Sequence, residues 1–487
     1  IKNRLLAGKM TFNSIDFFIF LPIVFGLYWF AARNSIKLQN FILLLASYVF
    51  YAFWDWRFLF LILFSSLADY FIGLGLSRTE KIQKRKYLLA GSIIINLGFL
   101  GFFKYYNFFA ESFSDAFSLM GHPMRVSSLS IILPVGISFY TFQTLSYSID
   151  LYKKKISHEK NVINFLTFVS FFPQLVAGPI ERASNLLPQF NKKRYFSYGN
   201  AVDGSRQILW GLFKKIVIAD GCAVSVNLIF SNYEQYSGST LLLGAILFSF
   251  QIYCDFSGYS DIAIGTARLF GIDLMQNFAS PYFSRNMAEF WRRWHISLST
   301  WFRDYLYIPL GGSKVKTFKN ILNVFAIFIV SGLWHGANWT FMAWGFLHAL
   351  YFLPLVVFKD NRRYLNTVAM GRYLPSFREL VSMVSTYLLV VFAWIFFRAE
   401  SISQAVDYIN IIFSESLVSY PEVDPRSLIV IIACFLAIEW FGREKQHPLA
   451  DMNSIKATSL RWGLYFSIIS IILLFKTSTQ QFIYFQF

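Results

Sequence analysis

Apolar residues in this chain occur in long continuous blocks rather than at the spacing of a soluble core. The clearest blocks are Leu59–Leu76, Leu88–Phe103, Leu241–Phe256, Ile321–Val330, Phe341–Phe358, Val384–Phe397, Ser427–Phe441 and Leu464–Phe475. A helix that spans a bilayer needs about 20 mostly apolar residues, and fewer when aromatic and cationic residues lie at the interfaces. The pattern predicts an all-α polytopic membrane protein with about nine to eleven spanning helices.

Lysine and arginine cluster in the loops between these blocks, and cytoplasmic loops carry an excess of both residues. The segments "SRTEKIQKRK" (77–86) and "YKKKISHEK" (152–160) are therefore predicted to face the cytoplasm, and the turn "SNYEQYSGST" (231–240) to face outward. Simple alternation fails at Phe165–Val176, because a full crossing there would place the next basic loop, "NKKRYF" (191–196), outside. The stretch "FFPQLVAGPIER" (171–182) also contains two prolines and a glycine. We expect a re-entrant or interfacial segment there, because irregular backbone is tolerated where protein covers it.

The domain organisation follows from the same pattern. Residues 10–487 are predicted to form one transmembrane domain, and residues 1–9, which precede Met10, are interpreted as an upstream extension. Residues 257–320 are more polar and aromatic, and are predicted to form a cytoplasmic or interfacial insertion within that domain.

Composition supports the membrane assignment. The chain is 56% hydrophobic and 15% charged, whereas a soluble domain averages about 25% charged residues. A net charge of +17 often indicates nucleic-acid binding, but these cations lie between apolar blocks, so we expect a lipid bilayer and no nucleic acid as the partner. Three widely separated cysteines form neither a disulfide framework nor a zinc set, and we expect no bound metal.

The first chemically distinctive segment is "EFWRRWHISLSTWFRDY" (289–305). Treated as one helix, it has an aromatic face that includes Trp294 and His295 and an opposite face that includes the arginines. Arginines in such a place extend to lipid head groups or bind an anionic ligand. The pattern also fits an interfacial amphipathic helix with a hydrogen-bonded core histidine.

The second segment is "VSGLWHGANWTFMAWGFLHALYF" (330–352), read as one long apolar span. His335 lies between two glycines, which permit the close approach of a helix or a ligand. Ionisable residues at membrane depth are rare and mark functional sites, although an interhelical hydrogen bond is the structural alternative. Asn338 and Trp339 follow one turn later on the same face, and Asn338 is a candidate to fix the imidazole tautomer. His348 falls well round the helix, and we do not expect it in the same site.

A third segment, "FQIYCDFSGYSDIAIG" (250–265), places two carboxylates directly after an apolar run. Ser257 and Gly258 are expected to loosen the helix between Asp255 and Asp261. The carboxylates either pair with the arginines of the predicted insertion or line an aqueous entry, and pairing is favoured.

These segments resemble the membrane-bound O-acyltransferase family, specifically its bacterial branch that acetylates alginate and related polysaccharides. The two histidine segments look like its hallmarks, and "PVGISFYTFQTLSYSIDLY", "FFPQLVAGPIERA", "QIYCDFSGYSDIAIG" and "NFASPYFSRNMAEFWRRWH" are also similar. The likeness runs from about Met10 to Leu353 and thins beyond. It implies a ring of tilted helices around a thin centre, with a funnel on each side meeting near the signature histidine. That residue matches His335, and the family's other histidine matches His295.

The resemblance also implies an activity. An acyl group, acetyl in this branch, passes from a cytoplasmic thioester towards hydroxyls of an extracytoplasmic polysaccharide, with a periplasmic esterase-like partner. Acetyl-CoA or an acyl-carrier protein is the expected co-substrate, no cofactor is expected to stay bound, and the location is the bacterial cytoplasmic (inner) membrane.

The residue types suit this chemistry. Imidazole has a pKa near about 6.5 and removes a proton as a hydroxyl attacks; alternatively, His335 carries the acyl group covalently, and the sequence does not separate the two. His295 is expected to orient substrate or stabilise developing charge. Candidate donor- or substrate-binding residues are Arg292, Arg293, Arg303, Trp294, Asn338, Trp339 and Asp255.

Two other functions fit the same composition. One is a glycan or lipid transporter or flippase without covalent chemistry, and the other is a membrane scaffold. Transporters often contain internal repeats with interrupted helices at matching places, and the sequence shows no evident repeat. A scaffold gives the histidines no role.

Overall fold

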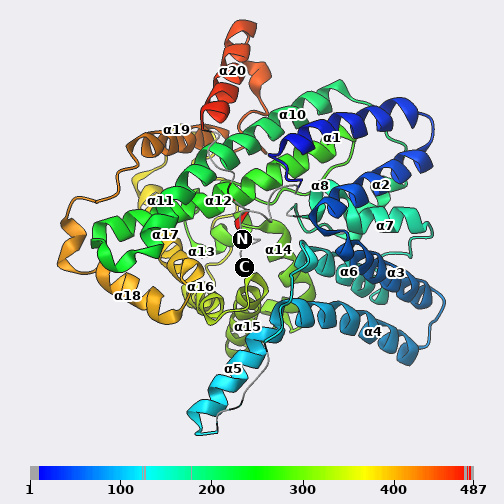
Figure 1. Ribbon diagram of the computed structural model, residues 1–487, viewed down its shortest axis with the longest axis horizontal. Coiled ribbons are helices and arrows are strands. Elements are labelled where there is room, and N and C mark those ends of the chain that lie inside the picture. Colours follow the sequence, from blue (N-terminus) through cyan, green and yellow to red (C-terminus); the bar gives the residue numbers. More distant parts are fainter. Residues whose placement is uncertain are drawn as a thin grey trace. The chain divides into compact units, whose positions relative to one another are not determined.

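The computed structural model describes residues 10–122, 124, 128–176, 178–475, 480 and 482–483, and all regular secondary structure in these ranges is helical (Figure 1). The chain divides into two compact units. Unit 1 comprises the chain up to Ala201 together with Thr266–Met275, and unit 2 comprises Val202–Gly265 and the chain from Gln276 onwards. The extension expected at residues 1–9 lies outside the described residues, and the single domain over 10–487 stays a prediction.

Within the described residues, seven helices are long and apolar enough to cross a membrane. They are α2 (Ile36–Asp55), α3 (Arg57–Ser77), the run of α4 (Ile82–Leu100), η3 (Gly101–Tyr105) and α5 (Tyr106–Leu119), α12 (Gly238–Leu269), α15 (Thr317–His335), α16 (Trp339–Val357) and α17 (Phe377–Arg398). Shorter apolar helices cover Ile15–Ala31, Val162–Leu175 and Thr458–Leu474. The all-α polytopic architecture is confirmed, whereas the ring, the central funnel and the larger number of spans stay predictions.

In unit 1, α3 packs against α4 and against α6 (Ile137–Tyr152), and Figure 1 shows α3 and α4 side by side. Asp69 of α3 is fully buried in this bundle. It accepts hydrogen bonds from Ser92 at 2.5 Å, Asn96 at 2.7 Å and Ser148 at 3.0 Å. Buried polar groups are stable only when they are hydrogen-bonded in this way.

The segment expected to be re-entrant forms two short helices, α7 (Val162–Ser170) and α8 (Phe172–Leu175). A nine-residue helix is about 13 Å long and cannot cross a hydrocarbon core of about 30 Å. Its neighbour Phe171, where the helix breaks, is fully buried. Protein therefore covers the irregular backbone, as the sequence predicts.

The two basic loops of unit 1 contact one another. Lys154 forms an ion pair with Glu80, and Arg85 donates to the carbonyls of Leu76 at 2.5 Å and Leu151 at 2.9 Å. Arg85 thus binds the last carbonyls of both α3 and α6, where cations are favourable. Both loops lie at the same end of unit 1, which agrees with the charge-based topology.

In unit 2, α10 (Tyr198–Phe213) packs closely on α12 through glycines. A Cβ atom on Gly258 would lie 2.7 Å from the Gly211 carbonyl oxygen, and one on Gly265 would lie 2.5 Å from that of Gly204. Helix α12 therefore continues unbroken through Ser257 and Gly258. The expectation that these residues loosen the helix is wrong, because Gly258 lies at a close contact between helices and α12 continues to Leu269. The cytoplasmic or interfacial insertion over 257–320 stays a prediction.

The span predicted over 330–352 is two helices, so that prediction is wrong. Helix α15 ends at His335, Gly336 is extended, and Asn338 caps the start of α16 by accepting from the Thr340 N–H at 3.0 Å. The two helices form an antiparallel hairpin and lie side by side in Figure 1. Unit 2 also contains η4 (Lys214–Ala219), α11 (Asp220–Ser231), α13 (Met287–Arg293), α14 (Ile296–Phe302), η7 (Arg303–Tyr307), α18 (Ile402–Ile412), α19 (Arg426–Gly442) and α20 (Thr458–Leu474).

Candidate active site

The first histidine segment is not one helix, and the prediction that it is one is wrong. Helix α13 ends at Arg293, α14 begins at Ile296, and His295 between them has a left-handed backbone with φ of 42°. The irregular stretch before α13 takes over the backbone hydrogen bonds: the Ala279 N–H donates to the Arg293 carbonyl at 3.0 Å, and the Ile296 N–H donates to the Asn277 carbonyl at 2.9 Å. Because these backbone groups are hydrogen-bonded to Asn277 and Ala279, the helix can break at His295 without leaving them unpaired.

His295 is fully buried and oriented by Asn277, which the sequence analysis did not select. The imidazole Nδ1 lies 3.1 Å from Asn277 Oδ1, while the Asn277 amide donates to Ser260 Oγ at 3.2 Å. An amide oxygen only accepts hydrogen bonds, so Nδ1 carries the proton and Nε2 carries the lone pair. Ser297 Oγ also donates to Asn277 Oδ1, at 2.9 Å, which holds the amide in place.

Burial controls the charge of His295. Removal of the ring from water lowers its pKa to about 3, because a low-dielectric environment disfavours the imidazolium. His295 is therefore neutral at neutral pH.

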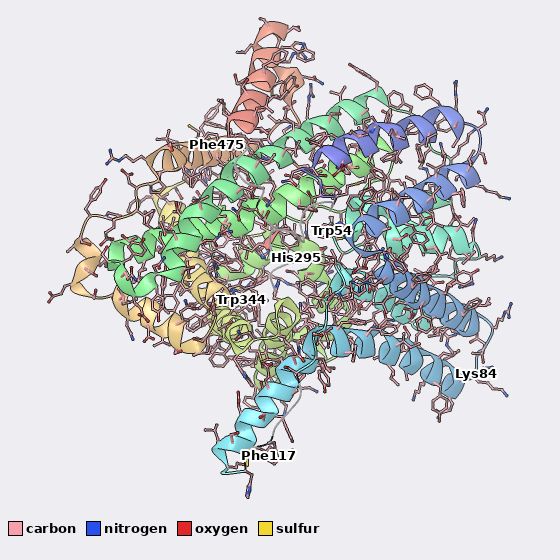
Figure 2. All side chains as sticks on the ribbon, in the orientation of Figure 1. Trp54, Lys84, Phe117, His295, Trp344 and Phe475 are labelled. Carbon is pink, nitrogen blue, oxygen red and sulfur yellow. The ribbon has the colours of Figure 1, made fainter. Side chains whose placement is uncertain are left out.

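His335 is the last residue of α15 and is enclosed by aromatic rings. Its ring centroid lies 5.0 Å from that of Trp334, 5.1 Å from Trp344 and 5.4 Å from Phe397. The centroid of His295 is 6.4 Å away. The fold therefore brings the two predicted histidines together, and Figure 2 labels His295 and Trp344, which belong to this cluster.

Trp334 and Phe397 complete the enclosure, and the sequence analysis selected neither. Trp334 contacts both histidines, because its ring lies 5.9 Å from His295 as well as beside His335. Trp334 adjoins His335 in the chain, but no spacing in the sequence relates Phe397 or Asn277 to the histidines. Such contacts arise only when distant segments pack together.

Trp294 and His348 flank this cluster. Trp294 is buried and packs on Phe290 at 5.5 Å and Trp394 at 5.1 Å between ring centroids. His348 contacts Trp344 at 4.7 Å and Trp291 at 5.0 Å. Trp344 thus contacts both His335 and His348.

The three candidate arginines have different surroundings. Arg292 donates to the carbonyls of Asn361 at 2.8 Å and Tyr364 at 2.6 Å, which ties α13 to the loop after α16. Arg293 donates to Glu289 at 3.1 Å. Arg303 pairs with Asp304 at 2.8 Å, and its side chain is 59% exposed. Arg292 is also exposed, whereas the side chain of Arg293 is only 13% exposed, so Arg292 and Arg303 are the ones accessible to an anionic ligand.

Asn338 and Trp339 do not take the positions expected from a single span. Besides capping α16, Asn338 donates through its amide to the Glu400 carbonyl at 3.0 Å. Its oxygen and its nitrogen thus both bind backbone groups rather than His335. Trp339 begins α16 and is 55% exposed.

Asp255 and Asp261 pair with lysines of η4. The expectation that they pair with the arginines of the predicted insertion is therefore wrong. Lys215 Nζ lies 2.7 Å from Asp255, and Lys214 Nζ lies 2.5 Å from Asp261. All four side chains are almost entirely buried. The expectation of pairing itself is confirmed.

A cavity of about 180 Å³ lies among α13, α14, η7, α15 and α16. Its lining is mostly apolar, with polar groups from Ser299, Arg303, Ser331 and Asn361. Ser331 lies one turn before His335 on the same helix face. Ligand pockets typically combine such an apolar lining with a few polar groups.

Comparison with known proteins agrees with this geometry. The profile of MBOAT, the membrane-bound O-acyltransferase family, matches residues 153–393. The chain is 38% identical over 441 residues, 89% of this chain and 81% of the relative, to the probable alginate O-acetylase AlgI of Pseudomonas aeruginosa. It is 36% identical over 428 residues, 82% of this chain and 78% of the relative, to a peptidoglycan O-acetyltransferase of Helicobacter pylori. It is 29% identical over 289 residues, 56% of this chain and 70% of the relative, to a teichoic acid D-alanyltransferase of Bacillus subtilis.

Proposed function

Because this chain belongs to the membrane-bound O-acyltransferase family and is an O-acyltransferase, we propose that it moves an acetyl group from a cytoplasmic thioester towards hydroxyls of an extracytoplasmic polysaccharide. The donor is acetyl-CoA or an acyl-carrier protein. A periplasmic esterase-like protein completes the transfer, and the protein resides in the bacterial cytoplasmic membrane.

One observation carries this proposal. His295 lies between α13 and α14, His335 ends α15, and their ring centroids lie 6.4 Å apart in a buried aromatic enclosure. Two imidazoles held in a dry site next to an apolar cavity are suited to acyl transfer, because exclusion of water protects a thioester from hydrolysis. A transporter without covalent chemistry gives this pair no role.

The reaction needs a base where the hydroxyl attacks. The hydroxyl oxygen forms a bond to the thioester carbonyl carbon, its proton passes to an imidazole lone pair, and the carbon–sulfur bond breaks as the thiolate leaves and takes up that proton. With a pKa of about 3, His295 is a weak base at neutral pH, because general bases work best with a pKa near the working pH. We therefore assign the base to His335.

His335 can also act as a nucleophile. In that route its lone pair forms a bond to the acyl carbon as the carbon–sulfur bond breaks and the thiolate leaves. In a second step the acceptor hydroxyl oxygen forms a bond to the acyl carbon, the carbon–nitrogen bond breaks, and the hydroxyl proton passes to the released imidazole and from it to the thiolate. Both routes need His335 neutral and its ring oriented, which the surrounding Trp334, Trp344 and Phe397 rings support.

His295 is proposed to orient the substrate and to stabilise charge as a neutral ring. The hydrogen bond to Asn277 assigns its tautomer and directs Nε2 away from that partner, so Asn277 is a positioning residue for this histidine.

The donor is proposed to enter through the cavity lined by Ser331, which lies one helical turn before His335. Its apolar lining suits an acyl-thioester arm, and exposed Arg303 is placed to bind the phosphates of a donor. The acceptor is an extracytoplasmic polysaccharide, which the names of the relatives, an alginate O-acetylase and a peptidoglycan O-acetyltransferase, support.

The proposal is tested in cells that produce a surface polysaccharide and either the wild-type protein or His335→Ala. Mass spectrometry of the isolated polysaccharide measures its acetyl content, and immunoblotting of membranes measures the amount of protein. We expect His335→Ala to abolish acetylation at an unchanged protein level, because loss of a general base alone costs about 10²–10⁴-fold in rate.

His447→Ala is the matched control. This histidine is also buried in unit 2, but it pairs with Asp203 at 3.1 Å rather than joining the ring cluster. We expect acetylation to persist in the control. Acetylation that persists in His335→Ala as well would contradict the assignment.

A further inference from the structure

Gln480, Phe482 and Ile483 follow α20 in the chain, and this segment contacts α12 and η4. Phe482 is 3% exposed and Ile483 is 1% exposed. The ring centroid of Phe482 lies 4.6 Å from that of Tyr259 and 6.0 Å from that of Phe256. These residues are thus part of the core of unit 2.

Hydrogen bonds anchor this segment to the buried Lys215–Asp255 pair. The Ile483 N–H donates to Asp255 Oδ2 at 2.6 Å, and Lys215 Nζ donates to the Gln480 carbonyl at 3.3 Å. Lys215 also pairs with Asp220 at 2.7 Å and with Asp255 at 2.7 Å. The buried ammonium of Lys215 in η4 therefore contacts α11, α12 and this segment. Buried charges are tolerated when they are paired and hydrogen-bonded in this way.

The ring of Phe256 connects this segment to the candidate active site. Phe256, the residue after Asp255, contacts Phe482 and also contacts His295 edge-on, with centroids 4.6 Å apart and an interplanar angle of 90°. Protein interiors are close-packed, so removal of one ring alters the position of the next.

We propose that Phe482, held by the Lys215–Asp255 pair, is a positioning residue for His295. The ring of Phe482 supports Phe256, and Phe256 in turn restricts the orientation of the His295 imidazole through their edge-on contact. This inference rests on the proposed acetyl transfer, in which His295 orients the substrate. It assigns a role to Asp255 as an anchor of this segment rather than as a substrate ligand.

The experiment compares Phe482→Ala, Phe482→Leu and Phe230→Ala in the full-length protein. Phe230 is a matched control because it is equally buried in unit 2 but stacks on Tyr408, with centroids 4.5 Å apart. Acetyl content of the polysaccharide per molecule of membrane protein gives the activity. The second measurement is the rate at which diethylpyrocarbonate modifies His295 in purified protein, measured by peptide mass spectrometry.

We expect Phe482→Ala to lower acetyl transfer by up to about 10²-fold, the cost of a misplacement of about 1 Å, and to raise the rate of His295 modification. Phe482→Leu, which keeps apolar bulk, is expected to restore most of both properties. Phe230→Ala is expected to lower the melting temperature without either change.

Transfer at the wild-type rate in folded Phe482→Ala, or an equal loss in folded Phe230→Ala, would overturn the inference. If Phe482→Ala does not fold, Phe482→Val, which removes most of the ring volume, is measured in its place, and unchanged transfer together with unchanged modification in folded Phe482→Val would overturn the inference. Failure of the proposed function is distinguishable, because then the wild-type protein itself transfers no acetyl group while the modification rates still report the position of His295.

Discussion

His295 combines a left-handed backbone, complete burial and a hydrogen bond to Asn277. A non-glycine residue with positive φ is uncommon and costs about 1–3 kcal/mol, and it persists where the surroundings hold it in place. Here the Asn277 carbonyl accepts from the Ile296 N–H, and Asn277 Oδ1 accepts from Ser297 Oγ, and these two hydrogen bonds hold the residues on either side of the strained position. The strained position directs the imidazole towards His335 instead of along a helix face.

Burial of His295 predicts a pH-dependent stability. The unfolded state takes up the imidazole proton below about pH 6.5, whereas the folded state, with a pKa of about 3, does not. The stability that neutral His295 contributes is complete above about pH 6.5 and is lost as the pH falls towards 3. At about pH 5 the loss reaches about 2 kcal/mol.

The measurement is the melting temperature of the detergent-solubilised protein at about pH 7.5 and about pH 5. We expect a smaller decrease in His295→Asn than in the wild-type protein. Asparagine tolerates the left-handed backbone, and carboxylates titrate equally in both proteins. The difference between the two decreases in melting temperature therefore measures the contribution of His295 protonation. Equal decreases would show that His295 does not titrate below its usual range.

At the scale of elements, glycines determine how closely α15 and α16 pack. A Cβ atom on Gly332 would lie 2.2 Å from the Phe341 carbonyl oxygen, and one on Gly345 would lie 2.2 Å from that of Phe328. The sequence predicted close approach at Gly332, and this is confirmed. The close contact also sets the position of His335, which ends α15 three residues after Gly332.

Gly332→Ala is expected to destabilise the protein by about 1–3 kcal/mol, the usual cost of overpacking, and to lower acetyl transfer because α15 must shift. Gly91→Ala in α4 is the control, since a Cβ atom there meets open space and alanine favours a helix by about 1 kcal/mol. Thermal unfolding in detergent measures the stability of both variants. A Gly332→Ala protein as stable as Gly91→Ala would contradict the packing argument.

For the whole molecule, the charge pattern predicts which loops face the cytoplasm. The ion pair between Lys154 and Glu80 places the two basic loops of unit 1 at one end, but it does not identify the compartment. We expect Lys84, labelled in Figure 2, to face the cytoplasm and Glu234 to face outward, because cytoplasmic loops are rich in lysine and arginine.

The test uses single-cysteine variants Lys84→Cys and Glu234→Cys in a background without the three native cysteines, labelled with a membrane-impermeant maleimide. Glu234→Cys is expected to react in intact spheroplasts, and Lys84→Cys only after the membrane is permeabilised. The reverse pattern would invert the topology and with it the side from which the donor approaches.

Sequence alone determined the class of the protein and the two histidine segments, and it predicted the break in the apolar run at α7 and α8, because apolar block length, cationic loops and proline are local properties. Close approach at Gly332 was also predictable, since a glycine within an apolar helix permits another backbone to approach closely. Local pattern is sufficient wherever the physical cause lies within one stretch of about 20 residues.

Tertiary structure decided the helix breaks at His295 and Gly336, the pairing of Asp255 with Lys215, and the contributions of Asn277, Phe397 and Phe482 to the surroundings of the histidines. Helical periodicity extends through Trp294 and His295, but the Asn277 carbonyl accepts from the Ile296 N–H and the Ala279 N–H donates to the Arg293 carbonyl, and these bonds replace the helical ones. Buried charges and rings likewise take partners from distant segments, because only the packed fold sets which desolvated groups lie within hydrogen-bonding distance.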